Sequence, residues 1–241
     1  MGSARLHRPK TSDSVVEHVI AQLFSGRLRA GDRIDLTAVA DELGVSRAPV
    51  REAMVVLERD GLVDIPFHKG VFVGRFDAEV LREAFELYGM VNALGSARVA
   101  RRADPAVLAA LDLVAAQARD ATSVDEWEER AREFRRTVNR ASGGPRMRSL
   151  LRTFSGLVPA ASRLSMPRSV SAERTFLLRE NDCLRAGDPH GAAEAVLDHV
   201  DLLGRIAVET LRDRGVLAAG PVEEPSGAGR DVVRVLVERD R

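Results

Sequence analysis

Apolar residues recur at intervals of three and four along the first sixty residues, which is the spacing of one helical face. The first such run extends from residue 14 to residue 24, and Asp13 before it is expected to cap the helix. A second run follows Asp35, which is another good N-cap, and stops at Gly44. The spacing therefore predicts two short helices.

A third helix is predicted to begin after Ser46, two residues beyond Gly44, and to stop at Gly61. Its apolar face consists of Val50, Ala53, Met54 and Leu57. Arg47 and Arg51 lie four residues apart on the opposite face. Two helices joined by a tight turn, with paired arginines at the start of the second, form a helix-turn-helix, whose second helix enters the major groove of DNA.

The side chains at the start of the third helix suit contacts with DNA. A guanidinium group donates two hydrogen bonds to O6 and N7 of guanine, a pairing that lysine does not match. Short hydroxyl side chains at helix ends, here Thr37 and Ser46, are expected to meet phosphate oxygens and fix the register of the protein. Helix-Gly-helix patterns also occur in proteins that never bind DNA, so this pattern alone leaves both interpretations open.

The hydrophobic period changes after Gly61. Residues 62–66 and 71–73 are rich in β-prone side chains, and residues 67–70 between them have the composition of a turn. These segments predict a hairpin. A hairpin behind a recognition helix is a wing, and Lys69 and Gly70 at its tip would approach the minor groove or the flanking DNA backbone.

Residues 77–215 show repeated helical periodicity and almost no β-prone alternation. Breaks are predicted at residues 104–105, 143–145 and 187–189. Six or seven helices would fill this span, and such a bundle can enclose a ligand cavity. The predicted fold class is therefore mainly α, with a winged helix-turn-helix of three helices and a hairpin followed by an all-helical bundle.

The predicted organisation has four segments. A flexible arm covers residues 1–10, the winged domain residues 11–75, the helical domain residues 76–215 and a flexible tail residues 216–241. The tail opens with a Gly-, Ala- and Pro-rich linker. Weak alternation from Val232 to Val237 leaves an added strand or a lid over the cavity as alternatives.

The 36 basic residues are balanced by 36 acidic residues over a chain of 241. Such a chain lacks the positive field of a protein that coats nucleic acid non-specifically, so any contact with DNA has to be local. The single Cys183 excludes an internal disulfide, and no apolar run is long enough to cross a membrane. We expect a soluble, cytoplasmic protein without a membrane partner.

The stretch from Arg29 to Met54, followed by Leu57, Gly61 and residues 68–73, resembles the winged helix-turn-helix of the GntR family of bacterial regulators. Two departures are small: alanine replaces the usual proline at residue 30 and a common threonine at residue 48. The resemblance implies a double-stranded DNA operator as partner. The DNA-binding residues that it implies are Arg33, Thr37, Ser46, Arg47, Ala48, Pro49, Arg51, Lys69 and Gly70.

The helical region resembles the FCD effector domain of the fatty-acid-regulator branch, through residues 133–135, 141–145, 184–188 and 192–200. Many such domains hold a divalent metal with one aspartate and three histidines. By register these positions fall on Ala131, Arg135, Leu177 and His199. One histidine is too few for a site that needs three or four protein ligands, so we predict a metal-free cavity without a cofactor. The cavity should also be more apolar than in metal-binding relatives. In many members of the branch an arginine meets an anionic effector, and Val91 is expected at that position in this chain.

A shift of one helical turn in this register would instead bring oxygen ligands near the remaining histidine, from Glu133, Glu180 or Asp198. The polar residues expected around a small-molecule effector are Arg135, Asn139, Asn181 and His199. Arg135 could pair with an anionic group of the effector. A solvated position for Arg135 and Asn139 fits the sequence equally well.

These features predict a regulator that binds a palindromic operator as a homodimer, with an affinity changed by a small molecule of unknown identity. The chain has no P-loop, no zinc-protease motif and no nucleophile elbow, so no enzymatic activity is expected. The alternative is a metal-binding helical enzyme or sensor with an accessory winged domain.

Overall fold

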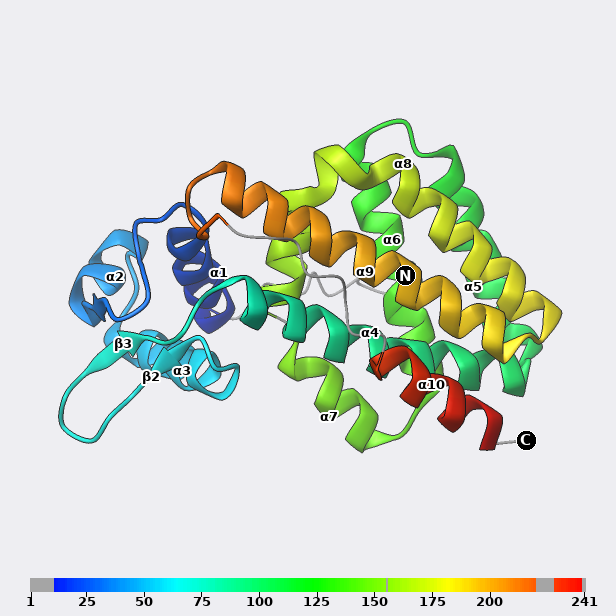
Figure 1. Ribbon diagram of the computed structural model, residues 1–241, viewed down its shortest axis with the longest axis horizontal. Coiled ribbons are helices and arrows are strands. Elements are labelled where there is room, and N and C mark those ends of the chain that lie inside the picture. The colour runs from blue at the N-terminus through cyan, green and yellow to red at the C-terminus, as the bar shows by residue number, and fades with distance from the viewer. Residues whose placement is uncertain (1–10, 155, 220–227, 240–241) are drawn as a thin grey trace, which may run out of the picture.

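The computed structural model describes residues 11–154, 156–219 and 228–239 (Figure 1). A small N-terminal part with three helices and a sheet lies at one end of the molecule, and long helices form the remainder. This arrangement confirms the predicted fold class. The predicted arm over residues 1–10 and part of the predicted tail, residues 220–227 and 240–241, lie outside the described residues.

Three short helices form the N-terminal part: α1 (Thr11–Phe24), α2 (Leu36–Leu43) and α3 (Arg47–Arg59). Their buried residues include all the apolar positions that the periodicity placed on the inner faces of α1 and α3. Asp13 lies in the first turn of α1 and does not precede it, so its predicted capping position is wrong. A carboxylate in a first turn still favours the helix through its dipole.

Three strands form one small antiparallel sheet in the order β1-β3-β2: β1 (Arg33–Ile34), β2 (Val63–Asp64) and β3 (Val71–Val73). The predicted hairpin is present, with Val63 opposite Val73. The sequence did not predict β1, which pairs Arg33 with Phe72. Two residues are too short for the alternation that identifies a strand.

Six helices lie in the described residues between 77 and 215. Three of the boundaries between them fall at the predicted breaks, and the two that precede residues 124 and 157 were not predicted. The helices are α4 (Ala78–Arg102), α5 (Pro105–Asp120), α6 (Val124–Ser142), α7 (Pro145–Thr153), α8 (Leu157–Ala186) and α9 (Pro189–Asp213). Aspartates 104 and 188 cap α5 and α9, and proline follows each of them in the first turn. Figure 1 shows α4, α8 and α9 running side by side along the long axis.

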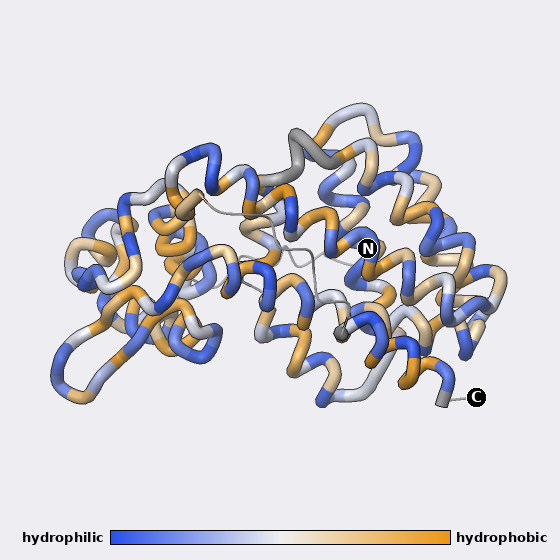
Figure 2. The backbone as a smooth tube through the Cα atoms, viewed as in Figure 1, coloured by the Kyte–Doolittle hydropathy of each residue, from blue (hydrophilic) through white to orange (hydrophobic). Residues whose placement is uncertain are grey.

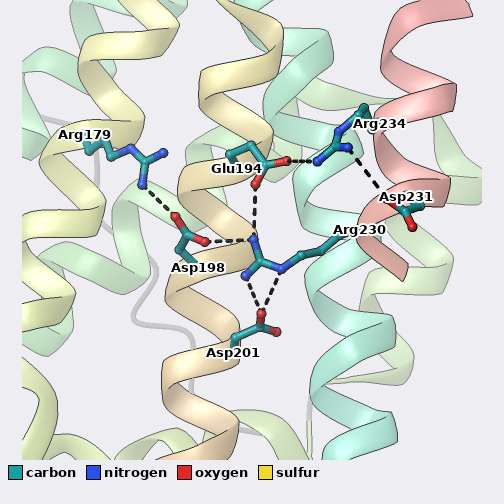
Figure 3. A network of polar contacts seen from close by, with 7 residues as sticks. All are labelled: Arg179, Glu194, Asp198, Asp201, Arg230, Asp231 and Arg234. Carbon is teal, nitrogen blue, oxygen red and sulfur yellow. Dashed lines mark hydrogen bonds and ion pairs between the residues drawn. The ribbon is translucent and has the colours of Figure 1, made fainter. Parts of the chain in front are cut away.

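Residues 228–239 form a further helix, α10 (Ala228–Arg239), against α4 and α9. Val233 and Val237 are buried, and Arg230 bonds to three carboxylates of α9 (Figure 3). The prediction of a flexible tail is therefore wrong for these residues. The alternation seen in the sequence is the four-residue spacing of a short amphipathic helix.

One apolar core runs through both parts of the chain, and a second cluster fills the far end of the bundle between α5, α6 and α8. In Figure 2 apolar positions gather on the inward sides of the helices. The shared core includes Val16 and Ile20 of α1 together with Leu157 and Val158 of α8. Within the described ranges, no helix is long and apolar enough to span a bilayer.

Candidate nucleic-acid interface and internal cavity

The turn between α2 and α3 is built from local capping. Asp35 accepts hydrogen bonds from the amides of Thr37 at 2.8 Å and Ala38 at 3.1 Å. Gly44 ends α2 in the left-handed region, with φ of 63°, where a side chain would be strained. These two residues fix where α2 begins and ends, and thereby the angle at which α3 leaves the turn.

The α2 cap also lies in a positive electrostatic environment. Hydrogen bonds from the amides of Ala38 and Thr37 lower the pKa of Asp35, and the charges of Arg33 and Arg47 lower it further. Both guanidinium groups therefore lie near the start of α2. Arg33 belongs to β1 and Arg47 to α3, so the fold brings together two arginines that are fourteen residues apart in sequence.

The two sides of α3 differ as predicted. Val50, Ala53, Met54 and Leu57 are buried, and Arg47 and Arg51 are both exposed. Ser46 occupies the N-cap position but makes no side-chain capping hydrogen bond, so its hydroxyl is available to another partner. The exposed Thr37 and Ala48 and the half-buried Pro49 complete this surface.

The turn of the wing lies next to β1. Gly70 has φ of 101°, and a Cβ there would lie 3.2 Å from Nε of Arg33. The Arg33 side chain therefore reaches the wing, whose tip exposes Lys69 and Phe67. The structure thus brings the predicted DNA-contacting residues of β1, α2, α3 and the wing to one end of the molecule (Figure 1). Their contacts with DNA stay a prediction.

A cavity of about 270 Å³ lies inside the helical part, between α4, α6, α8, α9 and the end of α7. The four positions that the register assigned to metal ligands, Ala131, Arg135, Leu177 and His199, all line this cavity. Asn139 lies on the same wall, one turn beyond Arg135 on α6, so three of the four predicted effector residues are brought together. Asn181 is not among them. Its amide bonds to Asp112 at 2.8 Å, at a separate hollow between α5 and α8.

Two basic side chains of the cavity, Arg135 and His199, each have an acidic partner. Arg135 forms a two-pronged ion pair with Glu180, which also accepts a hydrogen bond from Ser96 at 2.6 Å. Nε2 of His199 lies 3.3 Å from Oε2 of Glu173. In the part of the chain that the structure describes, no cluster of three or more His, Cys, Asp or Glu side chains is placed to hold a metal ion.

The oxygen ligands expected from a shifted register are engaged elsewhere. Glu180 pairs with Arg135, Glu133 with Arg130, and Asp198 with Arg179 and Arg230. In the described part of the chain, no hydrogen bond or ion pair joins the side chain of any of these three residues to His199. The carboxylate that does reach it, Glu173, was missed, although it lies on the same face of α8 as Leu177 and Glu180 at intervals of four and three.

The wall formed by α4 also differs from the prediction. Tyr88 lines the cavity, and Val91 one turn later does not. Phe154 packs edge-on against Tyr88, with ring centroids 5.7 Å apart. The cavity-facing position of α4 therefore lies about one turn before the expected one.

Comparison with known proteins supports both assignments. Residues 11–73 match the model for bacterial regulatory proteins of the gntR family, and residues 83–202 match the FCD domain. An uncharacterized HTH-type transcriptional regulator of Mycobacterium tuberculosis strain H37Rv is 35% identical over 91% of each chain. A probable D-xylose utilization operon transcriptional repressor of Paenarthrobacter nicotinovorans is 26% identical over 82% of this chain and 89% of its own.

Solved structures show the same fold. The E. coli protein McbR/YncC is similar with a TM-score of 0.58 at 18% identity, over 86% of this chain and 100% of that one. A putative GntR transcriptional regulator from Rhodococcus sp. RHA1 has a TM-score of 0.53 at 23% identity, over 81% and 96%. At these identities the likeness concerns architecture alone.

Proposed function

Because this chain belongs to the GntR family of bacterial regulatory proteins and has an FCD effector-binding domain, we propose that it binds a palindromic operator as a homodimer and releases or engages it in response to a small molecule. The chain is a transcriptional regulator by its family and its relatives. The observation that carries the proposal is the exposure of Arg47 and Arg51 together on α3, beside an exposed wing.

A two-fold dimer accounts for how so small a surface selects one site. Two copies of α3 related by a two-fold axis would enter successive major grooves of a palindrome, with half-site centres one helical turn, or a multiple of it, apart. Each guanidinium paired with a guanine discriminates by roughly 1–3 kcal/mol. We propose repression in the cytoplasm as the mode of action, since one relative is named a probable repressor.

The contact between α8 and α1 supports a response to a ligand. Val158 lines the cavity and belongs to the core that includes Val16 and Ile20. A Cβ added at Gly156, just before α8, would lie 3.3 Å from Cδ1 of Ile20 and 3.4 Å from Cγ1 of Val16. A ligand that moves the first turn of α8 would therefore move α1, and a coupling of about 1–3 kcal/mol is sufficient for a switch.

Fluorescence anisotropy with the DNA upstream of the protein's own gene tests operator binding. The wild-type protein should bind this DNA more tightly than a scrambled duplex, and its affinity should fall steeply as the salt concentration rises. Arg47→Ala, Arg51→Ala should lose most of this selectivity while its circular dichroism stays unchanged.

The matched control is Arg119→Ala, Arg140→Ala, which removes two exposed arginines from the helical part. It has the same net charge as the α3 variant, and we expect it to keep the preference for the upstream DNA. Equal binding of the wild-type protein to scrambled DNA, or an equal loss of selectivity in both variants, contradicts the proposal.

A further inference from the structure

The cavity in the helical part is small and mainly apolar. Its walls include Phe134, Leu151, Phe154, Leu177 and Leu203, and its volume is about 270 Å³. An apolar protein cavity of about 150 Å³ is enough to admit benzene. The space therefore suits a compact molecule with a substantial apolar body, on the premise of the proposed function that an effector binds here.

The charge on the Arg135 guanidinium is already neutralised. Burial would lower the pKa of Arg135, but the Glu180 carboxylate opposes this effect and the pKa is raised, so the arginine stays charged and paired. The Glu180 side chain is 2% exposed, and Ser96 donates to one of its oxygens. A carboxylate ligand beside Arg135 would also lie close to the Glu180 carboxylate and be repelled by it, and displacing Glu180 would leave a buried charge without its partner.

The remaining charged groups offer no alternative anion site inside the cavity. His199 faces Glu173, and Phe176 stacks on its ring with centroids 5.8 Å apart. Arg132 and Arg163 pair with Glu128 and with Glu17 of α1. Arg136 is exposed at the rim, where a single pairing contributes little because of solvent screening.

The Tyr88 hydroxyl is the polar group left to meet a ligand on the α4 wall. No other described residue donates to it or accepts from it. Burial raises the pKa of Tyr88, and the nearby Glu180 charge raises it further against the effect of Arg135. The phenol therefore stays protonated and offers both a donor and an acceptor.

We propose that the effector of this cavity is an uncharged, mainly apolar molecule with one hydrogen-bonding group placed against the Tyr88 hydroxyl, and that Glu180 excludes effectors whose carboxylate enters the cavity. Neutral phenols, alcohols and amides belong to this class. The Arg135–Glu180 pair thus occupies the cavity wall at the position where the register expected a metal ligand.

Isothermal titration calorimetry of the full chain with three probes of nearly equal shape tests this class: para-ethylphenol, ethylbenzene and para-ethylbenzoate. The phenol should bind roughly three- to tenfold more tightly than the hydrocarbon, the value of one net hydrogen bond, and the carboxylate most weakly. Tyr88→Phe keeps the ring and should remove the advantage of the phenol. The control Ser162→Ala should preserve it, because that hydroxyl already donates to the Val158 carbonyl at 2.9 Å.

Glu180→Gln is expected to increase the affinity of the cavity for a carboxylate probe. It keeps the shape of the side chain and frees the Arg135 charge, so binding of para-ethylbenzoate should tighten at least about tenfold while binding of para-ethylphenol changes little. If this variant fails to fold, the relative affinities of the wild-type protein for the three probes and the effect of Tyr88→Phe still test the proposal.

Three results would overturn the proposal. They are tightest binding of para-ethylbenzoate to the wild-type protein, no binding of any of the three probes, and a preference for para-ethylphenol that survives Tyr88→Phe. Neither experiment contains DNA. A failure of operator binding therefore leaves these results unchanged, and a wrong ligand class leaves the operator result unchanged.

Discussion

Replacing Arg135 by methionine would leave Glu180 almost completely buried without its cation. Breaking a buried ion pair by removing one partner typically costs about 3–5 kcal/mol. The Arg135 side chain is 18% exposed on the cavity side, and Ser96 keeps its hydrogen bond to the carboxylate. We therefore expect Arg135→Met to lower the free energy of unfolding by an amount near the lower end, about 3 kcal/mol.

The double variant Arg135→Met, Glu180→Leu removes both charges and should recover most of this loss, to within about 1 kcal/mol of the wild type. Urea unfolding followed by circular dichroism measures all these free energies. Arg132→Met is the matched control on the same helix, since Arg132 is half exposed and its pair with Glu128 is worth less than about 1 kcal/mol. The reasoning is refuted if Arg135→Met is as stable as the control Arg132→Met. It is also refuted if Arg135→Met, Glu180→Leu is no more stable than Arg135→Met alone.

Three further outcomes follow from the caps, the wing and α10. Asp35→Ala should lower the free energy of unfolding in urea by about 1 kcal/mol. Ser46→Ala loses no capping bond, so it should leave stability within about 0.5 kcal/mol but weaken DNA binding in anisotropy assays. Equal losses of stability in the two variants would contradict the cap assignment. Gly70→Val should weaken DNA binding through backbone strain in the wing, and an unchanged affinity would show that the wing takes no part. Burial would raise the pKa of Asp198, but hydrogen bonds from Arg179 and Arg230 lower it below its ordinary value. Its contribution to stability is therefore present above the ordinary pKa of an aspartate and is lost as the pH falls through the lowered pKa. The protection factors of the α10 amides in hydrogen exchange should accordingly fall in acid, and they should fall at neutral pH in Arg230→Ala. Unchanged protection factors in that variant would disprove the role of the network.

The N-terminal part was predictable because its signals are local. Asp35 and Gly44 set the ends of α2 within the range of a single turn, and the apolar spacing of α3 decided which side exposes Arg47 and Arg51. β1 was not predictable. Two residues have no period, and the strand exists because β3 offers it an edge on which to pair.

The walls of the cavity depend on contacts far apart in the sequence. The register placed Arg135 and His199 in the cavity, but their partners Glu180 and Glu173 come from α8, which reaches them through tertiary packing. Asn181 shows the limit of periodicity. It follows Glu180 directly, so it turns toward α5 and bonds to Asp112 on that helix.

Helix α10 was missed for a related reason. An isolated helix of twelve residues is marginal in water, and its composition after a Gly-rich linker is typical of a flexible end. Its apolar contacts through Val233 and Val237 and the bonds from Arg230 to α9 supply what local propensity lacks (Figure 3).

The central claim is that two guanidinium groups on α3 read guanines, and a double-mutant cycle with modified DNA tests it most directly. A footprint on the upstream duplex identifies the guanines that the protein protects, and each is replaced in turn by 7-deazaguanine, which lacks the N7 acceptor. For the wild type, one such replacement should cost about 1–3 kcal/mol of binding free energy. For Arg47→Ala, Arg51→Ala the same replacement should cost almost nothing, and an equal cost in both proteins would contradict the account.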